Sequence, residues 1–259
     1  MENKIYIVDA FTNEVFKGNP AGVCPLEAWP SDLMLQNIAM ENNLSETAFF
    51  VKEENGYRLR WFTPEYEIEL CGHGTLAAAY VIYNYYEKDI DGIIFNTLSG
   101  ELKVNKNENR IIMDFPLIEG KRTEIDDRIF EALGVIPIDA YEARDLMLVL
   151  SDEEDVLYLQ PNMDILKSLG YDGIMVTAKG RDCDFVSRFF VPNSVINEDP
   201  VTGSAHCTLV PYWAKRLNKT AFIAKQLSKR GGTLYCILKD NRVQISGEAK
   251  IYLEGIIEI

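Results

Sequence analysis

Short apolar segments rich in β-branched and aromatic residues alternate along the chain with Gly, Asn and Pro, a pattern typical of β-rich proteins. In the first half the pattern predicts strands at Thr47–Val51, Tyr57–Phe62, Ile93–Asn96, Glu101–Val104 and Arg110–Phe115. In the second half it predicts strands at Leu146–Leu150, Val156–Leu159, Ile174–Thr177, Phe185–Val191, Leu234–Leu238, Arg242–Ile245 and Ile251–Leu253. We therefore expect sheets whose strands are joined by tight turns.

Two segments are apolar enough to be central helices. Leu76–Tyr86 is apolar on nearly all sides, which predicts a helix buried in the first half of the chain. Its counterpart in the second half, Ala205–Leu217, contains Pro211, which we expect to kink or break the helix. The chain is therefore predicted to hold one buried helix in each half.

Two further helices are amphipathic. Ser31 can cap a helix that places Leu35, Ile38 and Ala39 on one face. Asn162 can cap a shorter helix that Gly170 ends. These helices are expected to flank the central ones.

The sequence repeats itself. Arg60-Trp61-Phe62-Thr63-Pro64 resembles Arg188-Phe189-Phe190-Val191-Pro192, which begins 128 residues later. Each copy continues through an acidic stretch into a glycine-containing turn, and pairing Gly72 with Gly203 gives a spacing of 131 residues. Leu98-Ser99-Gly100 and Leu227-Ser228 follow at a spacing of 129. Three landmarks in the same order predict two lobes of similar structure, formed by duplication.

The lobe boundary is expected near residues 116–125, where Gly120-Lys121-Arg122 interrupts the apolar pattern. This gives an N-terminal lobe of residues 1–118 and a C-terminal lobe of residues 119–259, whose last strand can pair back with the first lobe. In this α+β arrangement, each lobe is expected to consist of strands around one helix.

Charge and composition exclude several functions. The 259 residues carry 26 Lys+Arg against 40 Asp+Glu, a net charge of −14, which argues against nucleic-acid binding. No apolar run approaches the roughly 18 residues that cross a bilayer, and the first residues have no signal-peptide pattern. The five cysteines show no CxxC spacing, which favours free thiols in a reducing compartment. We therefore expect a cytoplasmic protein.

The two glycine-containing turns, Cys71–Thr75 and Val201–Ala205, each join an extended segment to a helix. Their backbone N–H groups lie at the positive end of that helix, and small residues allow close approach. If both turns face one cleft between the lobes, Gly72, Gly74, Gly203 and Ser204 can bind a small carboxylate there. Alternatively, the glycines serve only to make tight turns.

The chain has only two histidines, and both lie beside these turns. His73 is a candidate to shuttle a proton or to donate a hydrogen bond to a substrate, whereas His206 is better explained by packing inside its lobe. Asp199, before Pro200, is either a turn residue or a carboxylate at the cleft. The pattern alone gives Glu46 no role beyond that of a surface acid.

Two other site chemistries have weaker support. Cys71, His73, His206 and Cys207 could ligate a metal, but Cys-x-His is an unusual zinc spacing and we expect no metal. Ser204 could act as a nucleophile with a histidine and Asp199, but no GxSxG motif is present.

Four motifs together resemble the PhzF-like phenazine-biosynthesis isomerase family. They are Phe16-Lys17-Gly18-Asn19-Pro20-Ala21-Gly22-Val23, Asn43-Leu44-Ser45-Glu46-Thr47, Cys71-Gly72-His73-Gly74-Thr75 and Glu198-Asp199-Pro200-Val201-Thr202-Gly203-Ser204-Ala205. They occur in the family's order and span almost the whole chain. The family is similar to diaminopimelate epimerase in fold, which implies an α+β fold of two pseudo-symmetric lobes with an active site between them. Each lobe would be a mostly antiparallel, β-barrel-like sheet around a central helix.

This resemblance implies roles for the candidate residues. Glu46 would be the general acid and base that moves a proton on the substrate, assisted by His73 and Asp199. Gly72, Gly74, Gly203 and Ser204 would hold the substrate carboxylate. The reaction would need no cofactor, and the protein would be a homodimer.

Two alternatives stay open. Related epimerases use one cysteine from each turn as opposed acid and base. Cys71 occupies the first position, but the second copy carries Asp199-Pro200-Val201 there and Cys207 lies several residues beyond. An amino- or hydroxy-acid epimerase or racemase is therefore less favoured than an isomerase that uses Glu46. A non-catalytic small-anion binding protein would need only the backbone donors.

Overall fold

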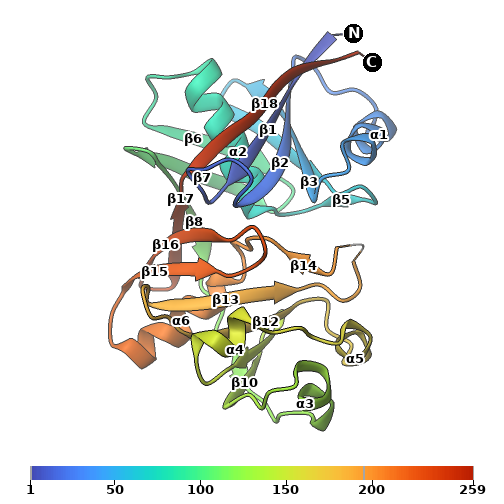
Figure 1. The fold of residues 1–259 in the computed structure, drawn as a ribbon. Helices are drawn as coiled ribbons and strands as arrows, with labels where there is room; N and C mark the ends of the chain where they lie inside the picture. The colour runs from blue at the N-terminus through green and yellow to red at the C-terminus, as the bar shows by residue number, and fades with distance from the viewer. Residues whose placement is uncertain (1, 195, 259) are drawn as a thin grey trace. The chain divides into compact units, whose positions relative to one another are not determined.

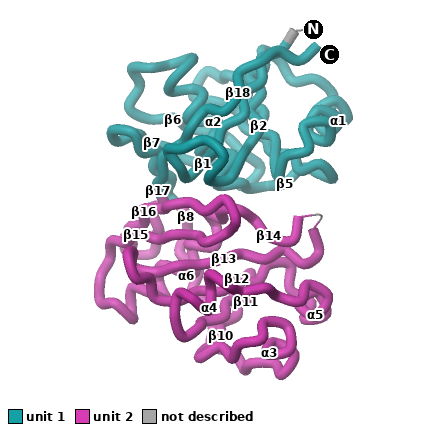
Figure 2. Tube along the Cα trace, viewed as in Figure 1, with its two compact units in different colours: residues 1–114, 246–259 teal, residues 115–245 magenta. Residues whose placement is uncertain are grey.

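The computed structural model describes residues 2–194 and 196–258, which form two compact units (Figure 2). The first unit consists of residues 1–114 and 246–259, and the second of residues 115–245. The chain leaves the first unit along β8 (Arg110–Pro116) and returns to it along β17 (Arg242–Gly247).

In the first unit, both ends of the chain lie in neighbouring strands. β1 (Glu2–Ala10) lies between β2 (Asn19–Leu26) and β18 (Ala249–Glu258) and is antiparallel to both (Figure 1). The register of β1 with β18 shifts between Ile7 and Val8, which marks a β-bulge. The C-terminal strand thus completes the sheet of the N-terminal unit.

The rest of this sheet alternates parallel and antiparallel pairs. β2 is parallel to β3 (Glu46–Glu53), which is antiparallel to β4 (Gly56–Phe62). β4 also pairs with the two-residue strand β5 (Glu67–Ile68) and, in parallel, with β6 (Gly92–Thr97). β6 continues into an antiparallel pair with β7 (Gly100–Asn107), which pairs with β8.

The helices of the first unit agree with the sequence prediction. α1 (Asp32–Asn42) is capped by Ser31 and buries Leu35, Ile38 and Ala39. α2 (Gly72–Val81) is buried almost throughout, packs against β1, β2, β3 and β18, and continues into a single π-helical turn, η1 (Ile82–Tyr86). Because the sheet surrounds this helix, its apolar residues form the centre of the unit.

The second unit repeats the topology of the first. β10 (Asp139–Glu142) is antiparallel to β11 (Leu146–Val149), and it also pairs with the two-residue strand β9 (Lys121–Arg122). β11 is parallel to β12 (Ile174–Lys179), which is antiparallel to β13 (Phe185–Phe190). These pairs correspond to β1 through β4 of the first unit.

The correspondence continues to the end of the repeat. β13 pairs with the two-residue strand β14 (Glu198–Asp199) and, in parallel, with β15 (Ala221–Gln226). β15 is antiparallel to β16 (Gly232–Lys239). β14 and β15 thus occupy the places of β5 and β6, which supports the duplication inferred from the sequence.

The central helix of the second unit, α6 (His206–Leu217), is not broken by Pro211. A proline at this position cannot donate to the carbonyl of Cys207. The backbone N–H of Ile118 donates to that carbonyl at 3.0 Å instead. Pro211 therefore does not break the helix, because another segment of the same unit replaces the missing hydrogen bond, and the alternative expectation of a kink stays a prediction.

The expected strand at Val156–Leu159 was also wrong. Residues Glu153–Leu157 form the helix α4, which Asp152 caps by accepting from the backbone N–H groups of Glu154 and Asp155. The shorter helix α5 (Met163–Ser168) is capped by Asn162 as expected, and α3 (Asp127–Leu133) is capped by Asp126. All the other expected strands agree with the structure to within a few residues.

Each unit has its own apolar core. In the second unit, α3, α4 and α5 pack on the sheet over a cluster that includes Leu148, Leu166, Ile174 and Val176. In the first unit, α1 packs over Cys24, Phe49 and Phe62. Within the described residues, no helix has the length and apolar character needed to cross a membrane.

Candidate active site

The first unit places Glu46 and His73 side by side. Glu46 begins β3, and His73 lies in the first turn of α2. Glu46 Oε2 lies 2.9 Å from His73 Nε2, within ion-pair distance. The His73 side chain is buried, whereas that of Glu46 keeps 16% of its surface exposed. The Glu46 side chain is therefore partly exposed, although its Oε2 is buried, and the imidazole is held inside the unit.

Asn19 fixes the other side of the His73 ring. Its Nδ2 lies 3.2 Å from His73 Nδ1. In the neutral ring, Nδ1 accepts from this amide, which only donates, and the ring proton lies on Nε2, the nitrogen nearest Glu46. Burial lowers the pKa of His73, but Cys71 and the Glu46 carboxylate outweigh burial and hold this pKa above its usual value. In the neutral and in the charged ring alike, Nε2 carries a proton, and it approaches Glu46 Oε2 within ion-pair distance but not in the geometry of a hydrogen bond.

Cys71 is the N-cap of α2. Its Sγ accepts from the backbone N–H of Gly74 at 3.3 Å and lies 3.5 Å from His73 Nδ1. Burial, together with the neighbouring Glu46 carboxylate, raises the pKa of this thiol. Cys71 is therefore a neutral thiol that caps a helix, which is unfavourable for a proton-abstracting thiolate.

Gly72 and Gly74 both lie in the first turn of α2. At Gly74 a Cβ atom would lie 2.8 Å from Cδ1 of the buried Trp61 and 3.0 Å from Cys71 Sγ. Packing beneath the indole thus accounts for glycine at position 74. Carboxylate binding at these two glycines stays a prediction.

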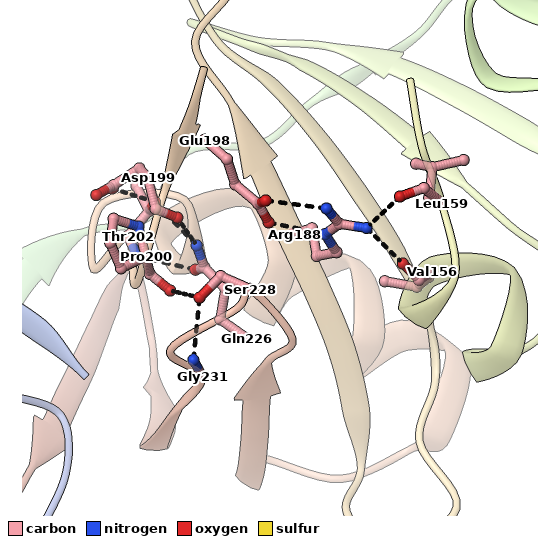
Figure 3. A network of polar contacts seen from close by, with 10 residues as sticks. All are labelled: Val156, Leu159, Arg188, Glu198, Asp199, Pro200, Thr202, Gln226, Ser228 and Gly231. Atoms are coloured by element: carbon pink, nitrogen blue, oxygen red, sulfur yellow. Dashed lines mark hydrogen bonds and ion pairs between the residues drawn. The ribbon is translucent and has the colours of Figure 1, made fainter. Parts of the chain in front are cut away.

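In the second unit, Asp199 belongs to a hydrogen-bonded loop before α6 (Figure 3). The Thr202 hydroxyl donates to Asp199 Oδ2. The side-chain amide of Gln226 donates to the Asp199 carbonyl at 2.8 Å and accepts from the Thr202 backbone N–H at 2.8 Å. Gln226 is 1% exposed, so this arrangement is held from inside the unit.

Gly203 and Ser204 follow directly on this loop. Gly203 is buried, and the Ser204 hydroxyl accepts from Arg144 Nη2 at 3.1 Å. The same nitrogen lies 2.6 Å from Asp145 Oδ2. The structure thus adds a guanidinium to the turn that the sequence proposed for carboxylate binding.

His206 is enclosed in the second unit. It is fully buried, its Nδ1 donates to the Thr202 carbonyl at 2.9 Å, and its ring packs against Phe185. Burial lowers the pKa of His206 to about 4, so the ring is neutral at pH 7. Burial also raises the pKa of Cys207 to about 12, which leaves the second unit without a reactive thiol at this turn. His206 therefore packs inside its lobe, as the sequence favoured.

The structure brings Glu46 and His73 together in the first unit, and Asp199, Gly203 and Ser204 together in the second. Among the residues that the structure describes, Glu46, Cys71 and His73 could hold a metal ion, with ligand atoms within 4.8 Å of one another. Cys71, however, is protonated and Glu46 already faces His73. The absence of a metal stays a prediction.

Sequence reasoning gave no role to Asn19, Arg144 or Gln226. Asn19 lies in the first of the four motifs, but nothing in the sequence connects it with a histidine 54 positions later. Arg144 and Gln226 lie outside every motif. Only the folded chain brings them to the turn before α6.

Comparison with known proteins agrees with this fold. The family model described as Phenazine biosynthesis-like protein matches residues 8–255. An uncharacterised isomerase of Pseudomonas aeruginosa is 47% identical, with 100% of both chains covered. The crystal structure of a PhzF-family phenazine biosynthesis protein from Enterococcus faecalis has a TM-score of 0.98 at 52% identity, with 100% of both chains covered.

A more distant structure shares the fold alone. A hydroxyproline epimerase from Agrobacterium vitis has a TM-score of 0.69 at 8% identity, covering 99% of this chain and 92% of the epimerase. The fold is thus the epimerase-like α+β fold with two pseudo-symmetric lobes, and the protein is an isomerase. This chain belongs to the phenazine biosynthesis-like family.

Proposed function

We propose that this isomerase needs no cofactor and moves a proton between carbon atoms of a small carboxylate-bearing metabolite, with Glu46 as acid and base. The observation that carries the proposal is the 2.9 Å approach of Glu46 Oε2 to His73 Nε2. Glu46 is the less buried member of this pair, which supports it as the group that meets the substrate. His73 and its partner Asn19 fix its orientation from behind.

The chemistry needs only two proton transfers. The Glu46 carboxylate takes a proton from a carbon next to a π-system, and the electron pair of the broken C–H bond delocalises into that system. The Glu46 carboxylic acid then returns the proton to another carbon of the same system, which shifts the double bond. His73 Nε2, 2.9 Å from Glu46 Oε2, stabilises the Glu46 carboxylate before the first transfer and after the second.

The second unit offers donors for the substrate carboxylate. We propose that Gly203 and Ser204 bind it, with Gly72 and Gly74 as the corresponding donors of the first unit, and that Asp199 assists the proton transfer. Arg144 supports this assignment because its guanidinium, already on Ser204, has further N–H groups for an anion. Its ion pair with Asp145 keeps the guanidinium in place.

A thiol-based epimerase is the second candidate, because the fold is shared with a hydroxyproline epimerase. Two observations weigh against it. Cys71 is a buried helix cap whose pKa burial raises. Cys207 in the other unit is also buried, with its pKa raised to about 12. A two-thiol mechanism would need at least one of these groups as a thiolate near neutral pH.

Proton NMR in D2O tests the proposal. Wild type, Glu46→Gln and Cys71→Ser are incubated with but-3-enoate and itaconate as unsaturated carboxylates and with trans-4-hydroxy-L-proline as an amino acid. Glu65→Gln is the matched control, because Glu65 is an exposed glutamate of the same unit. We expect deuterium uptake, or a shifted double bond, in wild type, Cys71→Ser and Glu65→Gln but not in Glu46→Gln.

The other outcomes separate the alternatives. Loss of exchange only in Cys71→Ser would replace the proposal with the thiol epimerase. Ligand resonances that shift without exchange in any variant would indicate the small-anion binding protein. Exchange that persists in Glu46→Gln would remove Glu46 from the mechanism.

A homodimer and a cytoplasmic location remain predictions. β18 leaves Tyr252 and Ile256 exposed, at 53% and 63%, which is an apolar surface of the kind that a second copy could cover. Light scattering coupled to size-exclusion chromatography would give a mass of one or two 29.5 kDa chains.

A further inference from the structure

The two units share a frame that holds the loop before each central helix. In the first unit Arg60 forms a two-bonded ion pair with Glu67 of β5, at 2.7 Å for both bonds. In the second unit Arg188 does the same with Glu198 of β14, at 2.7 and 2.9 Å (Figure 3). Each arginine also lies over a phenylalanine two residues later in its strand, Phe62 or Phe190.

A second duplicated contact secures the same loops. Ser99 donates from its hydroxyl to the Glu69 carbonyl at 2.8 Å, and Ser228 donates to the Pro200 carbonyl at 2.8 Å. These serines are the Leu-Ser landmarks of the sequence repeat. Because both units have the ion pair and the serine contact, these features serve the duplicated fold.

Gln226 is different, because the residue at the equivalent position of the first unit is not an amide. Equivalent positions in β6 and β15 are occupied by Thr97 and Gln226, and equivalent positions in β5 and β14 by Ile68 and Asp199. The amide of Gln226 therefore acts only in the unit that carries Asp199. The amide of Gln226 and the carboxylate of Asp199 thus occur together in the second unit and are both absent from the equivalent positions of the first, which points to a role in the site.

The partners of Gln226 determine which way its amide points. Oε1 accepts from the Thr202 backbone N–H, which can only donate, and Nε2 donates to the Asp199 carbonyl, which can only accept. Nε2 consequently faces Thr202 Oγ1 as well, at 3.3 Å. The Thr202 hydroxyl has a single proton, and with Nε2 on its other side that proton is directed to Asp199 Oδ2.

We propose that Gln226 is a positioning residue that sets the direction of a hydrogen-bond chain, from Gln226 Nε2 through the Thr202 hydroxyl to Asp199 Oδ2. This hydrogen-bond chain presents Asp199 to the substrate as a fixed hydrogen-bond acceptor. This inference rests on the proposed function of Asp199 and deepens it. Gln226 itself lies inside the unit and contacts no substrate.

Two sets of measurements test the inference, and the first needs no substrate. In 13C- and 15N-labelled protein, the Asp199 13Cγ shift and the hydrogen exchange of the Thr202 amide are compared in wild type, Gln226→Met and Thr202→Val. Ser228→Ala and Ser99→Ala test the shared frame. Gln36→Met is the matched control, because Gln36 Nε2 donates to the Thr63 carbonyl at 2.8 Å in the first unit.

We expect Gln226→Met to move the Asp199 13Cγ resonance as Thr202→Val does and to speed exchange of the Thr202 amide at least tenfold. Ser228→Ala, Ser99→Ala and Gln36→Met should leave the Asp199 resonance in place. An unchanged Asp199 resonance in folded Gln226→Met would overturn the inference, and so would an equal change in Ser228→Ala. Gln226→Glu, which keeps an acceptor for the Thr202 N–H but cannot donate, is the second variant if Gln226→Met does not fold.

The second set measures deuterium uptake with the probe that wild type exchanges. Gln226→Met and Gln226→Glu should lower kcat about tenfold to a hundredfold with little change in KM. The Asp199 carboxylate is misplaced in these variants, whereas the donors proposed to bind the substrate at Gly203 and Ser204 remain. Unchanged kcat in a variant whose Asp199 resonance has moved would overturn the link to catalysis. If wild type takes up no deuterium into any probe, the proposed function fails. The first set of measurements, on the labelled protein, then decides alone whether the hydrogen-bond chain exists.

Discussion

Arg60 and Arg188 lie 128 residues apart and form the same two-bonded ion pair in their respective units. Their third contacts differ. Arg60 Nη1 reaches the exposed Asp32, whereas Arg188 Nη1 donates to the carbonyl of Leu159 at 2.6 Å. Arg188 therefore also holds the backbone that follows α4, whereas the third contact of Arg60 is to a side chain.

This difference predicts unequal costs of removing the two arginines. Arg188→Met should lower the free energy of unfolding by about 3 kcal/mol, because it leaves Glu198 without its ion-pair partner and the Leu159 carbonyl without its donor. Arg60→Met should cost about 1–2 kcal/mol, because it leaves Glu67 without its ion-pair partner but leaves Asp32 in solvent and removes no donor from a backbone carbonyl. Urea unfolding of both variants measures the difference, and equal losses would contradict it.

The stability of the second unit should fall as the pH drops below the pKa of a histidine in the unfolded chain. The pKa of His206 is about 4 in the fold and about 6.5 in the unfolded chain, so below pH 6.5 the unfolded chain binds a proton that the folded chain does not. The group favours unfolding increasingly from pH 6.5 to pH 4, by about 3 kcal/mol in total.

Urea unfolding of wild type and His206→Asn between pH 7 and pH 4 isolates this contribution. Carboxyl groups titrate in both proteins, so only the difference between the two curves reports on His206. We expect wild type to lose stability more steeply than the variant. Parallel curves would show that His206 does not remain neutral in the folded protein.

The duplication could be read from the sequence because its landmarks are structural. The Arg-x-Phe segments carry the ion pairs, and the Leu-Ser segments carry the serine contacts, so the same residue types recur at nearly one spacing. The helix capped by Ser31 was equally readable, because its cap and its apolar face are local features. Local signals and repeats thus predicted most of the fold.

The errors had different causes, and only one of them lies in a distant segment. Pro211 is tolerated because Ile118, far away in sequence, supplies a hydrogen-bond donor. The apolar residues after Asp152 were taken for a strand, although the preceding acids cap a helix. β15 was missed because Ala221 and Lys225 weaken its strand pattern.

In the candidate site, some residues could be identified from sequence motifs and others only from the folded structure. Motif residues Glu46 and His73 could be named from the resemblance, but their contact depends on the packing of α2 against β3. Gln226 could not be named, because an amide in a strand has no sequence signature of its partners. Residues that position a catalytic group through another residue therefore need the structure.

The cysteines should differ in reactivity in an order set by burial. Cys71 is buried and its pKa is raised, whereas Cys183 is only partly buried and its pKa is raised to about 11. Iodoacetamide at pH 8 should therefore label Cys183 before the other four thiols, as followed by peptide mass spectrometry. Labelling of Cys71 first would mean that its thiol is activated, which would revive the epimerase mechanism.

Gly74 allows packing and substrate binding to be separated. Alanine at this position would bring a Cβ to 2.8 Å from Trp61 Cδ1, so Gly74→Ala should lower the free energy of unfolding by about 1–3 kcal/mol. Adding Trp61→Phe makes room, and the double variant should recover part of that loss relative to the sum of the single variants. If Gly74→Ala leaves stability unchanged but abolishes deuterium exchange, the glycine serves the substrate and the packing explanation is wrong.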